Sequence, residues 1–470
     1  MSGSDVHFDR RMSDAEAFMW KLEKDPWFSS TFSVLLILER PADFEGLRAR
    51  LSHAVADIAR LRERVVPAPT VGPPEWAPDP ELDLHHHVRR VALPQPASRR
   101  DLLDLAALLA SDPLDRTRPL WQFWCIDGLP EGQGAVLTKL HHTVSDGVGA
   151  LRLAEHYMDL DADAEPLAEL DLAPIVARAA VAQDREGDGP VGAAAGTVVN
   201  GLRRYTDLVR RATGEIALSV ADPGRIPERG NELMARLRHL TGELDTSGGA
   251  GSDLWRTRSR RRRLETASTS LTALKRAARQ HGATLNDAFL AAVAEGASRY
   301  HAELDSSVER FRATLVVSTR GEGSGANAFT PARIDLPAGA MPTGQRVEQV
   351  TAATRKVKEQ VAGEGFLAMA APLANVLPTS ALARMARQQA GAADFATSNV
   401  ATSPVPVWVG GAQVSEAYAL GPVAGTAFNV TLLSYCDRVD LGLHMDPSAV
   451  TEPGRLTRCV QEGLDLITGG

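Results

Sequence analysis

Short apolar runs alternate with helical apolar spacing along the first part of the chain. Residues 33–38 and 135–140 are apolar runs typical of buried strands, and apolar side chains recur at helical spacing over residues 47–58. Ser13 and Glu16 have the spacing of a capping box, in which a hydroxyl and a carboxylate bind free backbone N–H groups at a helix start. This order of helices and strands predicts an α/β layer architecture.

The same alternation returns in the C-terminal part. Apolar periodicity predicts helices over residues 271–280, 285–300 and 456–467, and a strand over residues 313–318. Two hairpins are also predicted, because turn residues separate pairs of strand-like runs. These are residues 405–409 and 412–417 across Gly410-Gly411, and residues 427–435 and 439–445 across Cys436-Asp437-Arg438.

A change in composition after residue 160 divides the chain. Residues 161–190 are rich in Ala, Asp and Glu and are predicted to be a solvated linker, and a helix is predicted around residues 199–209. A second stretch of small residues, DTSGGAG, ends at Gly251. We therefore predict three parts, which are an N-terminal lobe over 1–160, a linker with a helical segment over 161–251 and a C-terminal lobe over 252–470.

Composition and charge exclude several classes of protein. The 470 residues carry 51 Lys and Arg against 59 Asp and Glu, and the net charge of −8 argues against a nucleic-acid partner. Hydrophobic residues make up 44%, as in a globular protein. Three scattered cysteines fit neither a disulfide framework nor a metal site. Because no signal peptide or membrane-length apolar segment is found, we expect a cytoplasmic protein.

Three patterns carry weak signals. A G-x-G-x-x-G match that begins at Gly187 follows a polar linker and lacks the preceding strand that a dinucleotide site requires. The histidines at 85–87 are predicted to lie in a strand, where neighbours point to opposite faces, so we expect no metal site there. Residues 256–263, RTRSRRRR, contain six arginines and indicate either a solvated face or an anion site for a nucleotide phosphate or anionic lipid headgroup.

The motif HHTVSDG lies between a predicted strand and a predicted helix and carries the main candidate chemistry. A histidine at such a strand end can act as a general base near neutral pH. If strand alternation continues, His141 and His142 face opposite ways, so only one of them faces a given substrate. Asp146 can hold the turn and Gly147 permits a tight backbone. The alternative, a helix cap beside two polar core histidines, fits the spacing equally well.

HHxxxDG in this context resembles the CoA-dependent acyltransferase superfamily, and further ordered blocks resemble the bacterial wax ester synthase/diacylglycerol acyltransferase family. The similarity covers nearly the whole chain. The resemblance implies two chloramphenicol-acetyltransferase-like lobes, with mixed sheets flanked by helices and an active-site tunnel at their interface. Besides the histidine motif, the blocks that carry it are residues 12–32, 113–121, 286–300, 398–400 and 425–446.

The resemblance also implies roles for individual residues of the histidine motif. His142 would be the general base, while His141 and Gly147 would belong to the motif without acting as the base. Asp146 would hold the loop and orient the site.

Four residues outside the motif are implied to contact or position the substrate. Asn286, Ser398 and Asn399 fall where the family has polar residues near the tunnel, although Asn286 could instead cap its helix. Trp121 of the Pro-Leu-Trp element is expected in the tunnel wall or the core.

The implied reaction moves a fatty acyl group from acyl-CoA, a substrate rather than a cofactor, to diacylglycerol or a long-chain alcohol. No metal or prosthetic group is expected. Contact with a membrane surface or lipid droplet through apolar residues or the arginines is a hypothesis. Two alternatives stay open, namely an acyltransferase of secondary metabolism with a carrier-protein donor or non-lipid acceptor, and a catalytically silent lipid-binding protein.

The chain departs from the family pattern after Asn399. Where the family has Ser-Asn-Val-Pro-Gly-Pro, this sequence continues as Val400-Ala401-Thr402-Ser403, so the Pro-Gly turn is lost. Because of this departure, the resemblance does not identify which acceptor takes the acyl group.

Overall fold

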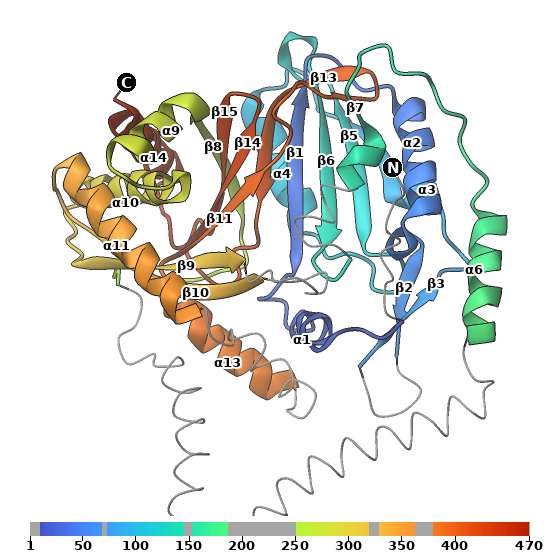
Figure 1. The fold of residues 1–470 in the computed structure, drawn as a ribbon, viewed down its shortest axis with the longest axis horizontal. Coiled ribbons are helices and arrows are strands. Elements are labelled where there is room, and N and C mark those ends of the chain that lie inside the picture. Colours follow the sequence, from blue (N-terminus) through green and yellow to red (C-terminus); the bar gives the residue numbers. More distant parts are fainter. Residues whose placement is uncertain are drawn as a thin grey trace, which may run out of the picture.

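The computed structural model describes residues 10–67, 73–144, 153–186, 251–318, 329–361 and 379–469. In them the chain forms two mixed sheets side by side, with helices against their faces (Figure 1). This arrangement confirms the predicted α/β class. The predicted helix at 199–209, the Gly187 motif and most of DTSGGAG lie outside the described residues.

The N-terminal sheet has seven strands. Its outer strand β4 runs parallel to β5, and the remaining neighbours pair antiparallel. In spatial order the strands are β4 (Val88–Ala92), β5 (Trp121–Asp127), β6 (Gly134–His141), β1 (Thr31–Leu38), β13 (Ala412–Leu420), β12 (Trp408–Val409) and β7 (Met158–Asp159). A separate hairpin consists of β2 (Glu63–Val66) and β3 (Glu75–Pro78).

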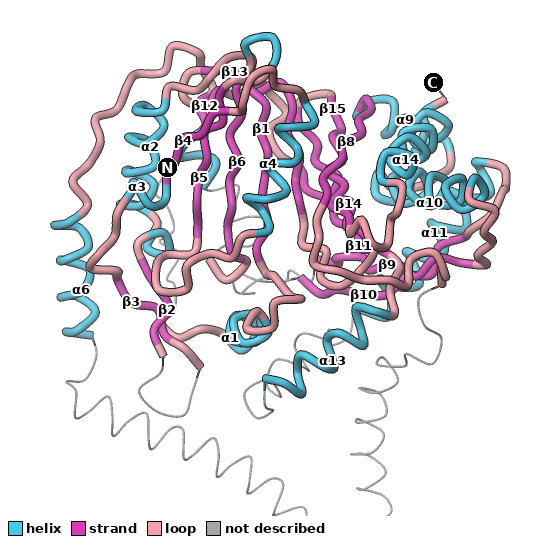
Figure 2. The backbone as a smooth tube through the Cα atoms, turned by 180° about the vertical axis from the view of Figure 1, so that it is seen from behind, coloured by secondary structure: helices cyan, strands magenta, loops and turns pink. Residues whose placement is uncertain are grey.

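The C-terminal sheet has six strands, of which β11 runs parallel to both of its neighbours. In spatial order they are β10 (Phe329–Pro337), β9 (Arg310–Ser318), β11 (Phe395–Ala401), β14 (Phe428–Tyr435), β15 (Arg438–Met445) and β8 (Arg263–Ser270). Figure 2 shows both sheets from behind, with their strands in magenta.

Helices pack against both sheets because their apolar faces continue the sheet cores. On the N-terminal sheet α2 (Phe44–Asp57) and α4 (Arg99–Ser111) cover opposite faces. On the C-terminal sheet α10 (Leu285–Glu303) and α14 (Pro453–Thr468) share one apolar core with the strands. The other elements are α1 (Asp14–Leu22), η1 (Ala59–Leu61), α3 (Leu84–His87), η2 (Pro130–Gly132), α6 (Ala173–Glu186), α9 (Leu271–Gln280), α11 (Thr343–Val361) and α13 (Thr379–Gly391).

Local sequence signals predicted several of these elements correctly. Both bonds of the Ser13–Glu16 capping box are present at the start of α1, and a second box between Thr284 and Asp287 starts α10. The turn between β12 and β13 lies at Gly410 and Gly411, as predicted, and both have positive φ angles. The strand before it is shorter than the predicted 405–409, because β12 covers only Trp408–Val409. The second hairpin is confirmed as well, but its turn is one residue shorter than predicted because Arg438 already pairs with Tyr435.

Two predictions about local structure were wrong. Residues 85–87 belong to one helical turn, α3, rather than to a strand, because the Asp83 side chain accepts the backbone N–H of His85 and caps the turn. The predicted solvated linker contains α6, in which Val176 is buried and Ile175 packs against the N-terminal core. The Gln183 amide of this helix donates to the carbonyl of Trp76 at 2.7 Å. Its alanines favour a helix even though charged residues surround it.

The C-terminal part of the chain completes the N-terminal sheet. Strand β13 pairs antiparallel with β1, so that Leu36 faces Ala417 across the ladder. The two sheets meet closely at this crossover, since a Cβ at Gly442 of β15 would lie 2.2 Å from the carbonyl oxygen of Ala419 in β13. Only glycine permits that approach. Residues from both ends of the sequence therefore build the N-terminal sheet, and its C-terminal strand β13 meets the second sheet.

Candidate active site

The two motif histidines lie at the end of β6, where the backbone holds them from both sides. The N–H of His141 donates to the carbonyl of Leu120 at 3.1 Å, and the N–H of His142 donates to the carbonyl of Ser30 at 2.8 Å. Successive residues thus bond in opposite directions, as in a continuing strand. The chain then turns, with the N–H of Val144 bonded to the carbonyl of His141 at 2.9 Å.

The His141 side chain is buried, with 1% of its surface exposed. Its Nε2 lies 2.7 Å from Oε2 of Glu23, and its Nδ1 lies 2.7 Å from the hydroxyl of Thr143. The backbone N–H of Thr143 also donates to Nδ1, at 3.1 Å. In the neutral ring Nδ1 is therefore an acceptor and Nε2 donates to the Glu23 carboxylate. Both ring nitrogens of His141 are thus engaged within the protein.

Glu23 binds His141 from the end of α1. Its other carboxylate oxygen accepts the N–H of Ser30 at 3.1 Å, and Arg116 lies 3.6 Å from Oε2. Burial raises the pKa of Glu23, but the hydrogen bond and attraction of His141, with smaller effects of Ser30 and Arg116, lower it overall below its ordinary value. The ionised carboxylate therefore joins α1, the start of β1 and the end of β6.

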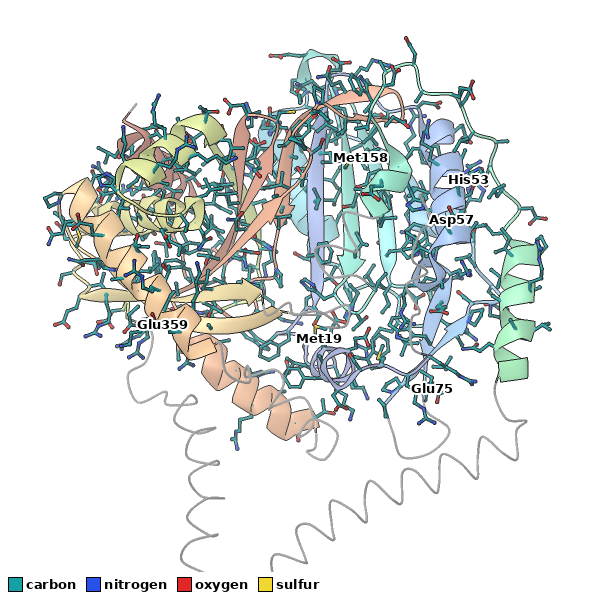
Figure 3. All side chains as sticks on the ribbon, in the orientation of Figure 1. Met19, His53, Asp57, Glu75, Met158 and Glu359 are labelled. Carbon is teal, nitrogen blue, oxygen red and sulfur yellow. The ribbon has the colours of Figure 1, made fainter. Side chains whose placement is uncertain are left out.

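His142 has a different environment from its neighbour. Its side chain is half-buried, and its ring packs on Phe32 of β1 with the ring centroids 4.7 Å apart. Helix α1 lies beneath this end of the sheet, where Met19 is buried (Figure 3). The structure thus gives the two histidines different partners, in line with the predicted opposite orientations.

The other two motif residues, Asp146 and Gly147, lie outside the described residues. Trp121, expected in the tunnel wall or core, is fully buried in the N-terminal core. Its indole N–H donates to the carbonyl of Leu61 at 2.8 Å, and its ring stacks on His87 with centroids 4.4 Å apart. Burial lowers the pKa of His87 to about 4, which keeps that ring neutral. Trp121 therefore has the contacts of a core residue.

Asn286 and Asp287 occupy the first turn of α10. Asp287 is buried and caps the helix by accepting from Thr284, and it also accepts the hydroxyl of Thr354 in α11 at 2.6 Å. The side chain of Asn286 is half-buried. The capping role that was open for Asn286 thus belongs to Thr284 and Asp287.

The structure separates Ser398 from Asn399 on β11. Ser398 pairs with Thr431 and Asn399 with Leu432, and paired residues share a face of the sheet. Leu432 faces the core beneath α10 and α14, while Leu433, on the other face with Thr431, contacts the N-terminal core. Ser398 therefore faces the N-terminal lobe, and Asn399 is exposed on the opposite side.

The missing Pro-Gly turn has a structural consequence. Strand β11 continues through Ala401, and Thr402 extends its pairing with β14 through an N–H bond of 3.0 Å to the carbonyl of Ser434. The first proline of the family pattern would fall at Ala401, inside this strand, where prolines are rare because they have no N–H for the ladder. The departure from the family pattern thus lies at the end of the strand that carries Ser398.

Glu23 was not identified from the sequence, although a signal was present. An acidic residue at a helix C-terminus opposes the helix dipole, which favours cations there. Glu23 is the C-cap of α1. A long-range partner compensates for this unfavourable position, and that partner is His141, 118 residues away in sequence.

The arginines of residues 256–263 are largely used within the protein. Arg256 pairs with Asp253 at 2.6 Å and Arg263 with Glu265 at 2.8 Å, while Arg258 donates to the carbonyls of Gly425 and Ala393 and Arg262 to those of Ser259 and Arg261. Arg260 and Arg261 are exposed. Contact with an anionic membrane surface or lipid droplet stays a prediction.

Two further searches concern the described residues alone. None of their helices is both long enough and apolar enough to cross a bilayer. Among the same residues, no group of three or more His, Cys, Asp or Glu side chains is placed to hold a metal ion.

The sequence matches two family models along most of its length. The wax ester synthase/diacylglycerol acyltransferase catalytic domain matches residues 12–289, and the corresponding C-terminal domain matches residues 326–468. A putative diacylglycerol O-acyltransferase of Mycobacterium tuberculosis is 28% identical and covers 99% of this chain and 93% of its own length. Another from Mycobacterium bovis is 31% identical and covers 78% of each chain.

Solved structures show the same fold. The wax ester synthase/diacylglycerol acyltransferase of Marinobacter aquaeolei VT8 superposes with a TM-score of 0.64 at 22% identity and covers 98% of this chain and 100% of its own. The first condensation domain of the CDA synthetase follows with a TM-score of 0.54 at 18% identity, covering 99% and 97%. Given the two matched domains and these relatives, the chain belongs to the wax ester synthase/diacylglycerol acyltransferase family and is an acyltransferase.

Proposed function

We propose that this acyltransferase moves a fatty acyl group from coenzyme A to the hydroxyl of diacylglycerol or of a long-chain alcohol, with His142 as the general base. The proposal is supported by the family and by relatives that are named diacylglycerol O-acyltransferases. The products would be a triacylglycerol or a wax ester. No metal or prosthetic group takes part in the proposed reaction.

The observation that carries the proposal is the different environment of the two histidines. His141 has both ring nitrogens engaged by Glu23 and Thr143 in a buried site. His142 is half-buried, its N–H is bonded to Ser30 and its ring packs on Phe32, so the ring is held in place and the side chain is partly exposed. A general base needs that combination of fixed position and access to substrate.

The proposed chemistry begins with the acceptor. His142 takes the proton of the alcohol as the oxygen attacks the thioester carbonyl, because a neutral alcohol is a weak nucleophile. The C–O bond forms and the carbonyl oxygen becomes an oxyanion. When this intermediate collapses, the C–S bond breaks and the imidazolium returns its proton to the leaving thiolate. The acyl group passes directly to the acceptor and the proton passes to the thiolate, so no acyl-enzyme is formed.

Residues of the C-terminal lobe would assist by binding the substrate. Ser398 faces the N-terminal lobe from β11, and the half-buried Asn286 lies at the start of α10. Hydroxyl and amide groups there can orient the acyl group or donate to the oxyanion. Preorganised donors to the oxyanion contribute strongly to the rate of acyl transfer.

An acceptor panel tests the proposed function. Release of free CoA thiol from palmitoyl-CoA would be measured with hexadecanol, with a diacylglycerol and without an acceptor, and the lipid products would be separated by chromatography. We expect thiol release to depend on an acceptor and to match the ester formed.

Two outcomes would contradict the proposal. Release equal to the blank with both acceptors, and with an acyl-carrier-protein donor as well, would indicate a silent lipid-binding protein. Transfer only from the carrier-protein donor, or only to a non-lipid amine or alcohol, would instead place the enzyme in secondary metabolism.

A further inference from the structure

An open hollow of about 410 Å³ lies between the end of α1 and one face of α13. The two helices come from opposite parts of the sequence and lie side by side below the sheets in both views (Figures 1 and 2). This volume is within the range of small-ligand sites. The lining residues are Asp25, Ser380, Ala383, Arg384 and Arg387.

The chemistry of the hollow is that of an anion site. Ser380, Arg384 and Arg387 are four and three residues apart, which brings all three to one face of α13. Two guanidinium groups face one carboxylate, so the lining is positive in a chain of net charge −8. Guanidinium groups bind phosphate oxygens through two parallel N–H donors, and a serine hydroxyl adds a third donor.

The two arginines are held differently. Arg387 donates to the carboxylate of Asp25 at 2.7 Å and lies 5.6 Å from the ring centre of Trp27. Arg384 is exposed, and within the part of the chain that the structure describes no hydrogen bond or ion pair engages it. The hollow therefore has one arginine fixed in place and a second one available for a ligand.

The hollow lies close to the candidate base. Asp25 follows Glu23 by two residues, so their Cα atoms are at most ~7 Å apart. Glu23 in turn binds His141, the neighbour of His142. A ligand in the hollow could therefore reach the site of acyl transfer with a flexible arm.

We propose that this hollow binds the phosphate groups at the nucleotide end of the acyl donor, coenzyme A, and that Arg384 makes the main contact. The inference rests on the proposed function. Diacylglycerol and long-chain alcohols carry no charge, so they have no group that would pair with the two guanidinium groups. The donor carries phosphates at one end of its pantetheine arm and the thioester at the other, which matches a cationic hollow beside the base.

Direct binding provides the first test, because it does not depend on turnover. Calorimetric titration with CoA, dephospho-CoA and adenosine 3′,5′-bisphosphate would be run on the full chain, on Arg384→Ala and on Arg384→Lys. We expect Arg384→Ala to weaken binding of CoA and of the bisphosphate about tenfold or more, and the lysine to restore part of it.

A matched control variant is Arg276→Ala. Arg276 is an exposed arginine on α9, which lies at the upper edge of the molecule in Figure 1, whereas α13 lies at its lower edge. This variant should bind CoA as the parent does. Equal CoA affinity in the parent and in Arg384→Ala would overturn the proposal.

Kinetics provide the second test. With palmitoyl-CoA, Arg384→Ala should raise KM about tenfold and leave kcat unchanged, whereas palmitoyl-pantetheine, which lacks the nucleotide, should give the same KM in both proteins. An equal rise for both donors would overturn the assignment, and so would an effect confined to an acyl-carrier-protein donor. Should the parent transfer no acyl group at all, the proposed function fails, while the titrations still decide whether the hollow binds CoA.

Discussion

At the scale of single residues, strand alternation places two adjacent histidines in different surroundings. His141 points to α1 and engages both ring nitrogens, while His142 contacts Phe32 and keeps partial exposure. Glu23 fixes the first of them, and through the Ser30 backbone it also fixes the strand end that bonds the N–H of His142. If His142 is the base, as proposed, its position depends on the Glu23 carboxylate, which is engaged by His141, Ser30 and Arg116.

Replacing Glu23 by Gln tests this positioning role. The amide keeps the shape but loses the charge, and we expect kcat to fall about 100-fold, because small displacements of a reacting group cost about that much. KM for acyl-CoA should change little. Steady-state kinetics and calorimetric titration with CoA would measure the two quantities separately.

The same variant has a pH signature. The pKa of Glu23 is lowered in the folded protein from an ordinary value of 4.5, so its stabilisation is complete above that pH and is lost as the pH falls through the lowered value. At pH 7 the free energy of unfolding should be lower in Glu23→Gln than in the parent. On acidification it should fall less in the variant than in the parent. Glu45→Gln, at an exposed position on α2, is the control. An unchanged kcat in Glu23→Gln would contradict the proposal that Glu23 positions His142.

At the scale of elements, two adjacent residues at the start of α10 are predicted to differ in role, Asp287 in stability and Asn286 in substrate binding. Asp287→Ala removes the helix cap and the bond from Thr354, and we expect the free energy of unfolding to fall by about 1–3 kcal/mol. Asn286→Ala should leave stability nearly unchanged and lower kcat/KM instead. Chemical denaturation and steady-state kinetics of both variants would show the difference. A stability loss in Asn286→Ala without a kinetic effect would assign that residue to structure.

Elements with local signals were predictable from the sequence. The capping boxes at Ser13 and Thr284 and the turn at Gly410-Gly411 depend on residues within a few positions of one another. The one-turn helix α3 was missed because a single Asp83 cap overrides the alternation expected of a strand. Helix α6 was missed because its few apolar residues find their core only in the folded chain.

At the scale of the whole molecule, both ends of the sequence build the candidate site. Strand β13 completes the N-terminal sheet beside β1, and α13 packs near α1. The histidine motif could be found from its residues alone. The Glu23–His141 bond and the Asp25–Arg387 pair join positions 118 and 362 residues apart, and no local pattern predicts such contacts.

The central claim is that His142 activates the acceptor hydroxyl, and the His142→Ala variant tests it most directly. Transfer from palmitoyl-CoA to the acceptor that the parent uses would be followed together with unfolding and CoA binding. We predict that kcat falls about 10²–10⁴-fold, as expected for the loss of a general base, while unfolding and CoA affinity stay as in the parent. Transfer at the parental rate in His142→Ala would contradict the account.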